Sequence, residues 1–168
     1  SFDIFELKLG IPQNYKQKCI KEAYNLGNSI ENTKDYTNVK AIHSTYRVWK
    51  ETKIYNPLLN NIKLSINKIL TPSFNVSGIH QFILKTAWTA IYKKGSYADG
   101  HFHYPTHFSF VYYFQASGNT PLVFDHSDFQ YSPQDDRLII FPANLYHSVP
   151  PHTSDEDRIC LAGNILML

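Results

Sequence analysis

The carboxyl-terminal half of the chain consists of short apolar segments separated by turn residues, and this pattern limits the possible folds more than any other feature. The strand-like segments are residues 81–92, 108–115, 121–124, 138–141 and 158–166. The breaks between them carry Gly, Pro, Asn or Asp. Several short strands separated by turns are typical of a β-sandwich or barrel. The 12 Tyr and 11 Phe favour the same class, because aromatic rings pack well on pleated sheets.

The amino-terminal part of the chain predicts helices instead. Residues 1–9 alternate like one short strand. Apolar residues then recur at helical spacing from Asn14 to Gly27. A second apolar stripe follows Pro57 and ends at Pro72. These stripes predict two helices that each bury one face.

The helical and β-rich parts fit into one domain. A chain of 168 residues is long enough to bury a sizeable core, and this length suggests one compact domain. We therefore expect a single mainly β domain over residues 1–168, in which a helical front (about residues 1–75) buttresses a β-rich core (about residues 79–168). Apolar residues make up 43% and charged residues 18% of the chain, which excludes a disordered tail or a coiled coil.

Composition also bears on location and partners. Cys19 and Cys160 are too few for a disulfide framework and suit a reducing compartment. No apolar run approaches the ~20 residues that cross a bilayer, and residues 1–10 lack the pattern of a signal peptide. We expect a cytoplasmic protein without a membrane partner. No run of basic residues interleaved with aromatics indicates a nucleic-acid surface, so nucleic acid is not an expected partner either.

Histidines gather in the part of the chain that lacks lysine. All 13 Lys precede residue 95, whereas six of the eight His lie between residues 101 and 152. His101 and His103 are two residues apart, so on a strand both imidazoles face the same side. His147 follows a buried-looking segment, and a neighbouring strand can bring it opposite this pair. Three imidazoles suit a transition metal, although the pair alone also fits two strand-end residues bonded to the backbone.

Arg158 is the second unusual residue. It is one of three arginines and opens an apolar segment in which alternation places Cys160, Ala162 and Asn164 on its own face. A buried guanidinium is unfavourable unless it meets an anion, and its planar fork binds a carboxylate at two points. An inward Arg158 near the histidines therefore indicates a carboxylate ligand beside a metal. The alternative is a rim arginine paired with the acidic run at residues 155–157.

Several motifs follow one another in an order and spacing that is itself informative. They are Trp88 in a strand that leads to Gly95 and Tyr97, then His101 and His103, then Ser109 with Tyr112 and Tyr113, then the segment 138–142 before His147, and finally Arg158 and Asn164. In this order the sequence from Trp88 to Ile165 resembles the iron(II)- and 2-oxoglutarate-dependent oxygenases. It is most similar to a group of small, mostly uncharacterised bacterial and phage members with a His-x-His motif.

The resemblance implies a fold and a set of site residues. The fold would be a double-stranded β-helix, a cupin-like jelly roll, with the site inside its open end. His101, His103 and His147 would bind iron, with Asp99 as the substitute for His103. The usual triad has a carboxylate at that position, and Ala90 stands where the family often has Asn. The remaining implied residues are Arg158, Tyr112, Tyr113, Tyr92 and Asn164 around 2-oxoglutarate, and His107 and Tyr104 on the substrate side.

The resemblance also implies an activity. The protein would use Fe(II), 2-oxoglutarate and O₂ to hydroxylate a C–H bond, with no catalytic residue beyond the metal centre. The substrate would be a protein or peptide side chain, or else a small molecule. Two other readings stay open: a three-His cupin-type iron dioxygenase that does not use 2-oxoglutarate, and a non-catalytic β-sandwich binding module. The sequence predicts no oligomeric state.

Overall fold

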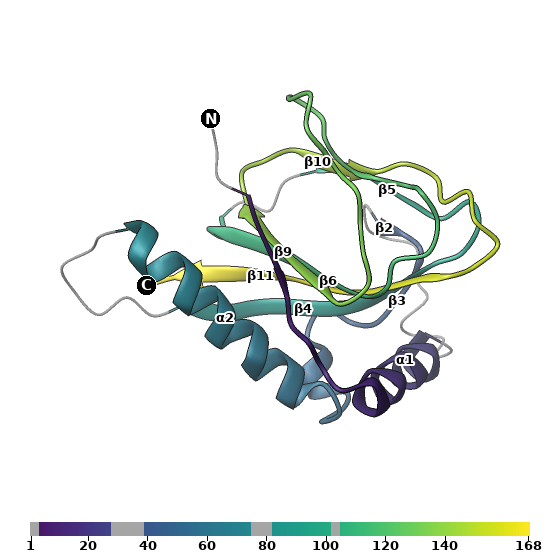
Figure 1. The fold of residues 1–168 in the computed structure, drawn as a ribbon, viewed down its shortest axis with the longest axis horizontal. Helices are drawn as coiled ribbons and strands as arrows, with labels where there is room; N and C mark the ends of the chain where they lie inside the picture. The colour runs from purple at the N-terminus through teal and green to yellow at the C-terminus, as the bar shows by residue number, and fades with distance from the viewer. Residues whose placement is uncertain (1–3, 28–38, 75–81, 102–104) are drawn as a thin grey trace.

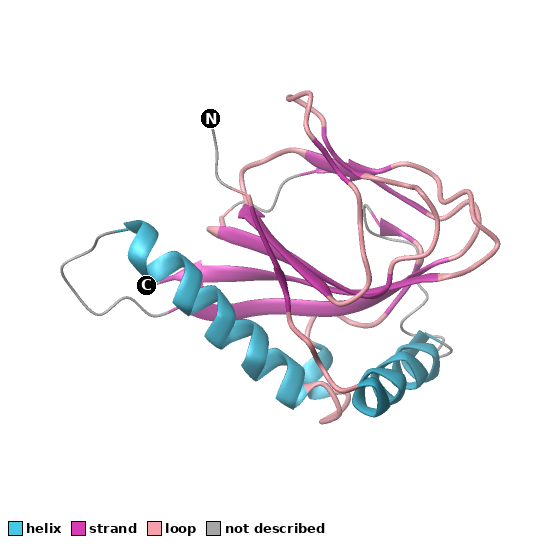
Figure 2. Cartoon of the chain, in the orientation of Figure 1, coloured by secondary structure: helices cyan, strands magenta, loops and turns pink. Residues whose placement is uncertain are grey.

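The computed structural model describes residues 4–27, 39–74, 82–101 and 105–168. Within these residues two antiparallel sheets lie over one another, and helices cover the outer face of the larger sheet (Figures 1 and 2). The larger sheet has the order β1 (Phe5–Lys8), β9 (Arg137–Pro142), β6 (Phe108–Gln115), β11 (Arg158–Met167), β4 (Phe82–Tyr92) and β3 (Ile42–His43).

The smaller sheet lies over the inner face of the larger one. Its order is β2 (Val39–Lys40), β5 (Tyr97–His101), β10 (His147–Val149), β7 (Leu122–Phe124) and β8 (Gln130–Tyr131). Consecutive strands often belong to different sheets, so the chain crosses between them repeatedly. This alternation brings segments that are far apart in sequence, such as the end of β5 and the start of β11, around one interior space.

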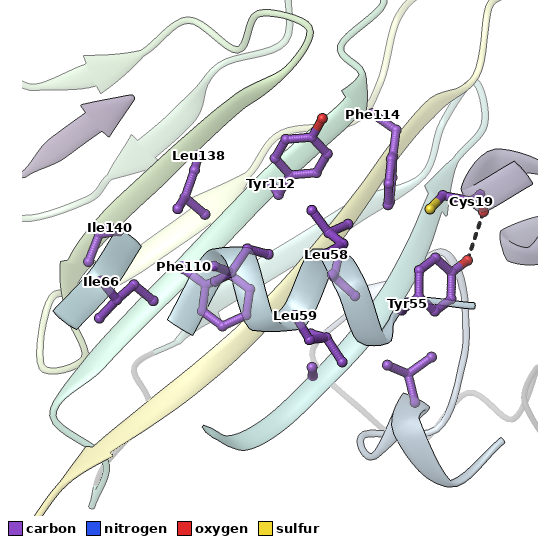
Figure 3. Close-up of a cluster of buried hydrophobic side chains, with 14 of the residues drawn as sticks. Cys19, Tyr55, Leu58, Leu59, Ile66, Phe110, Tyr112, Phe114, Leu138 and Ile140 are labelled. Atoms are coloured by element: carbon purple, nitrogen blue, oxygen red, sulfur yellow. Dashed lines mark hydrogen bonds between the residues drawn. The ribbon is translucent and has the colours of Figure 1, made fainter. Parts of the chain in front are cut away.

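The helices α1 (Gln13–Gly27) and α2 (Asn56–Phe74) supply the outer layer, with a short 3₁₀ turn η2 (Val48–Lys50) before α2. The apolar stripe of α2, which includes Leu58 and Ile66, is fully buried against β6 and β9 (Figure 3). Burial of each such side chain contributes roughly 1.5–3 kcal/mol. The Tyr55 hydroxyl donates to the carbonyl oxygen of Cys19 at 2.8 Å and so joins the start of α2 to α1.

The side chains of β6 separate the two cores of the molecule. Phe110, Tyr112 and Phe114 belong to the core beneath the helices, whereas Tyr113 belongs to the core between the sheets. This division follows from the alternation of side chains along a strand. The core between the sheets is also aromatic, with Trp88, Tyr92, Phe124 and Phe141 among its buried members.

The structure confirms the mainly β class. The predicted strands coincide with β1, β4, β6, β7, β9 and β11, with small shifts at their ends, and both predicted helices are present. The helix α2 continues through Pro72 to Phe74 rather than ending at Pro72. The φ of proline is compatible with a helix, so Pro72 does not end α2 at its own position. The helix ends two residues later than the sequence indicated. Neither helix in the described residues has the length and hydropathy of a membrane span.

Candidate metal and cosubstrate site

A cavity lies between the two sheets. His101, His147, Arg158, Tyr92 and Tyr113 are among the side chains that line it. The structure therefore brings together two of the histidines, His101 and His147, and the arginine that the sequence singled out separately.

His101 and His147 face one another across a strand pair. His101 is the last residue of β5 and His147 the first residue of β10, and the antiparallel register places the two directly opposite. Their ring centroids are 4.4 Å apart. Both imidazoles can therefore reach a single ion in the cavity.

The hydrogen bonds of the two rings define their tautomers. Nδ1 of His101 is 2.5 Å from the carbonyl oxygen of Asp99, and Nδ1 of His147 is 2.9 Å from that of Leu145. A carbonyl oxygen only accepts, so each Nδ1 carries the proton and the lone pair of the neutral ring is on Nε2. Metal-binding histidines usually donate their second ring nitrogen to such an acceptor.

The surroundings keep both rings neutral. Burial, together with the neighbouring His101, lowers the pKa of His147 to about 4. Burial also lowers the pKa of His101 below its ordinary value. The ring centroid of His147 lies 4.9 Å from that of Phe141 and 6.4 Å from that of Phe124. These two rings shield the imidazole from water. Neutral imidazole is the form that binds a metal.

The third ligand position lies outside the described residues. His103, predicted as a ligand, and Tyr104, predicted on the substrate side, both fall in residues 102–104. Among the residues that the structure describes, no group of three His, Cys, Asp or Glu side chains can hold a metal ion. Asp99, the substitute for His103, is exposed and is absent from the cavity lining; its backbone oxygen instead orients His101.

Arg158 lies in the same cavity but on the larger sheet. It is 2% exposed, and Nε donates to the carbonyl oxygen of Ala116 at 2.8 Å while Nη2 donates to that of Ser117 at 3.2 Å. Burial lowers the pKa of the guanidinium below its ordinary value. Arginine nevertheless stays charged, because its ordinary pKa is so high.

The acidic run beside Arg158 does not neutralise it. Asp157 pairs with Lys93 at 3.0 Å, and Asp155 pairs with Lys94 at 3.4 Å. Among the described residues no ion pair joins Arg158 to a carboxylate. The rim pairing considered from the sequence is therefore wrong. Arg158 is thus a buried charge at the wall of a cavity, and its hydrogen-bond partners among the described residues are carbonyl oxygens. Such a charge fits a ligand that carries a carboxylate.

The structure separates the two neighbouring tyrosines of β6. Tyr113 lines the cavity, as does Tyr92, and burial raises the pKa of both, so their hydroxyls stay protonated and can donate. Tyr112 faces the helices (Figure 3), and its hydroxyl donates to Oδ1 of Asp136 at 2.7 Å. The prediction of Tyr112 near a cosubstrate is thus corrected, because alternation along β6 sends it to the opposite face.

Two further predicted residues lie outside the cavity lining. Asn164 bridges three strands: Ser109 Oγ donates to its Oδ1 at 2.8 Å, and its Nδ2 donates to Thr86 Oγ1 at 2.9 Å. Ser109 itself does line the cavity. His107 is exposed, and its Nδ1 accepts the backbone N–H of Met167 at 3.0 Å. It therefore closes the end of the β6–β11 pair rather than facing a substrate.

Sequence reasoning missed the groups that hold Arg158. They are the main-chain oxygens of Ala116 and Ser117, at the start of the turn after β6. A turn was indicated by Gly118, but a backbone acceptor leaves no trace in a side-chain pattern. Only the packing of this turn against the start of β11 shows the contact.

Comparison with known sequences gives one family match. The sequence model of a family of putative 2OG-Fe(II) oxygenases matches residues 124–164. This segment contains His147, Arg158 and Asn164. No curated protein matches the chain.

Solved structures show the same fold over nearly the whole chain. The viral collagen prolyl hydroxylase of Paramecium Bursaria Chlorella virus-1, in complex with 2-oxoglutarate, has 15% identity and a TM-score of 0.68 over 96% of this chain and 94% of its own. A Pseudomonas putida prolyl-4-hydroxylase has 16% identity and a TM-score of 0.67 over 99% and 93%. A Trichoplax adhaerens prolyl hydroxylase in complex with a hypoxia inducible factor peptide fragment has 12% identity and a TM-score of 0.67 over 97% and 83%.

The fold is therefore the jelly roll of these oxygenases, as the sequence predicted. Together with the family match over residues 124–164, the fold indicates a 2-oxoglutarate- and iron(II)-dependent oxygenase. Enzymes of this kind are oxidoreductases that use Fe(II), 2-oxoglutarate and O₂.

Proposed function

We propose that this oxygenase is a hydroxylase whose iron is held by His101, His147 and His103, and whose 2-oxoglutarate is held by Arg158. The observation that carries the proposal is the pairing, in one cavity, of two imidazoles with protonated Nδ1 atoms and a buried guanidinium that has no carboxylate partner among the described residues. Fe(II) fits the first group and the distal carboxylate of the keto acid fits the second.

The residues of the chain have distinct tasks in this proposal. Arg158 binds the distal carboxylate, and the hydroxyls of Tyr92 and Tyr113 donate to the same ligand from the adjoining wall. Trp88 and Phe141 line the cavity with apolar surface and keep water away from the reacting groups. When bound, iron supplies the activation of O₂ that is coupled to oxidative decarboxylation of 2-oxoglutarate to succinate and CO₂.

The substrate we propose is a side chain of a protein or peptide, and a prolyl residue is the first to test. Support comes from the fold neighbours, which include prolyl hydroxylases and one complex with a peptide fragment. A small metabolite is the alternative. Incubation with peptide libraries or metabolite extracts, followed by mass spectrometry for the gain of one oxygen atom, distinguishes the two.

Anaerobic titration with Fe(II) and then 2-oxoglutarate tests the cosubstrate. We expect a visible metal-to-ligand charge-transfer band in the wild type and a much weaker one in Arg158→Gln. The matched control is Arg137→Gln, because Arg137 is the first residue of β9, is absent from the cavity lining and donates to the carbonyl oxygen of Asp135 instead. Full metal loading without keto-acid binding would refute the proposal. Oxygen uptake without formation of succinate would favour a three-His iron dioxygenase that does not use 2-oxoglutarate. The feature that supports this alternative is a histidine, His103, as the proposed third ligand.

A further inference from the structure

His152 is a buried histidine that the proposed chemistry does not use. It is 2% exposed and lies in the segment between β10 and β11. Its backbone N–H donates to the carbonyl oxygen of Ser96 at 2.8 Å, and its own carbonyl accepts the N–H of Gly95 at 2.7 Å. The residue is thereby fixed to the turn between β4 and β5, at the end of the sandwich where β11 begins (Figure 1).

The imidazole of His152 uses both nitrogens in this place. Nε2 is 2.7 Å from the carbonyl oxygen of Glu156, and Nδ1 is 3.4 Å from Oγ1 of Thr120. Because a carbonyl only accepts, Nε2 carries the proton and Nδ1 accepts from the threonine hydroxyl. The ring thus connects its own segment to the turn after β6.

The same turn packs closely on the ring at a second point. Gly118 has a φ of +82°, and a Cβ atom at this position would lie 3.1 Å from Cε1 of His152 and 3.0 Å from Cβ of Ser154. Both the positive φ and the short approach require glycine here. The backbone of the turn therefore rests directly against the imidazole.

This turn is also the one that holds Arg158. Ala116 and Ser117 provide the carbonyl oxygens for Nε and Nη2 of the guanidinium. Apart from the contact of Thr120 with His152, the only other side-chain hydrogen bond to the turn in the described residues runs from the N–H of Ala116 to Oδ1 of Asp135, at 2.7 Å. One edge of the guanidinium is thus occupied by the turn, and the position of the turn determines which edge a ligand meets.

We propose that His152 is a positioning residue, which fixes the turn at residues 116–120 and through it the orientation of Arg158 towards the distal carboxylate of 2-oxoglutarate. The inference rests on the proposed function, since it takes Arg158 as the carboxylate-binding group. It predicts that His152 controls cosubstrate affinity without touching cosubstrate or metal.

Two keto acids separate this role from a general loss of structure. One is 2-oxoglutarate, and the other is 2-oxopentanoate, which has the same chain length and keto-acid head but no distal carboxylate. Their dissociation constants are measured by anaerobic calorimetry on Fe(II)-loaded protein. We expect His152→Phe to weaken 2-oxoglutarate about tenfold, an effect of the size of one charge-assisted hydrogen bond, and to leave 2-oxopentanoate unchanged.

Further variants make the test independent of one substitution. Thr120→Val removes the hydroxyl that Nδ1 accepts, and we expect it to weaken 2-oxoglutarate about threefold. The matched control is His126→Phe, because His126 is exposed and its ring centroid lies 5.2 Å from that of Tyr146, in a tilted arrangement. In an Arg158→Gln background, His152→Phe should cause no additional loss, because the two residues act on one contact.

The outcomes distinguish the two proposals. Equal weakening of both keto acids, or no weakening of 2-oxoglutarate by either His152→Phe or Thr120→Val, would overturn the positioning role while leaving Arg158 as the carboxylate-binding group. An Arg158→Gln protein that binds 2-oxoglutarate like the wild type would overturn the proposed function, and the positioning role with it.

Discussion

The two ends of the cavity are held in different ways. At the histidine end, each imidazole is oriented by a carbonyl oxygen two residues earlier on its own segment, Asp99 for His101 and Leu145 for His147. At the arginine end, Arg158 is oriented by carbonyl oxygens of a turn more than 40 residues earlier in the chain. These orienting hydrogen bonds are therefore local at the metal end, whereas at the cosubstrate end they depend on how a distant turn packs.

This difference has a functional consequence. Changes far from the cavity can alter the binding of 2-oxoglutarate without altering the binding of metal, because the hydrogen bonds that orient Arg158 come from a distant turn. Changes in metal affinity should require substitution of the histidines or of the strands that carry them. The following predictions test this separation of the two ends.

The largest effect is expected from a direct change at the histidine end. His101→Ala removes a proposed ligand from the end of β5, and we expect Fe(II) affinity to fall at least about 100-fold, since outer partners of metal ligands alone account for 10- to 100-fold. Metal titration by calorimetry measures the loss. The control is His107→Ala, since His107 binds backbone outside the cavity lining. Fe(II) binding of His101→Ala at wild-type strength would contradict the assignment.

The next effect is expected at the arginine end. A ligand present at 100 times its dissociation constant stabilises the folded state by about 2.7 kcal/mol, so 2-oxoglutarate should raise the Tm of the Fe(II)-loaded wild type. Arg158→Gln should abolish this rise, because a carboxylate then faces an uncharged wall, and should leave the rise produced by Fe(II) alone. Anaerobic thermal unfolding measures both. If Arg158→Gln abolished the Tm rise caused by Fe(II) as well as the rise caused by 2-oxoglutarate, the two ends of the cavity would not be separable.

A smaller effect distinguishes the neighbouring tyrosines of β6. Tyr113→Phe removes a hydroxyl from the cavity wall, and we expect 2-oxoglutarate to bind about 3- to 10-fold more weakly. Tyr112→Phe removes the hydrogen bond to Asp136 and should instead lower the free energy of unfolding by about 1 kcal/mol. Urea unfolding and keto-acid titration of both variants form the comparison. If Tyr112→Phe weakened 2-oxoglutarate and Tyr113→Phe lowered only the stability, the side chains of β6 would face the opposite sides of the sheet.

These tyrosines also show how far sequence reasoning reaches. The alternation of β6 indicates that Tyr112 and Tyr113 face opposite sides, but both sides are apolar cores, so no local signal says which side holds the cavity. The sequence singled out His101 and His147 because histidines gather in the part of the chain without lysine, and Arg158 because it opens an apolar segment. Ala116 and Ser117 were not, because their main-chain oxygens contribute whatever the side chain is.

The strands of the smaller sheet show a second limit. The segments that became β5 and β10 contain Asp99, Gly100 and Ser148 and have little strand propensity of their own. They pair because the larger sheet and its loops bring them together, with His147 opposite both His101 and Phe124. Strand length and pairing of this kind are tertiary properties, so the sequence predicted the site residues at these strands but not the strands themselves.

The smallest effect concerns the support of the arginine end by the helical layer. Burial alone would raise the pKa of Asp157, but the hydrogen bond from Tyr24 of α1 and the ion pair with Lys93 hold it below its ordinary value. A carboxylate with a lowered pKa stabilises the fold above its unfolded-state pKa, and this stabilisation is lost as the pH falls through the folded-state value. Asp157 directly precedes Arg158.

We therefore expect Tyr24→Phe to lower the free energy of unfolding by about 0.5–1 kcal/mol at pH 7 and by less at pH 3, where Asp157 is becoming protonated in the unfolded chain. Urea unfolding at the two pH values measures the difference, and Tyr112→Phe is the control, since Tyr112 hydrogen-bonds Asp136 rather than Asp157. If Tyr24→Phe also weakens 2-oxoglutarate, the supports of Arg158 extend to α1. If it changes stability alone, they end at the loops that pack on β11.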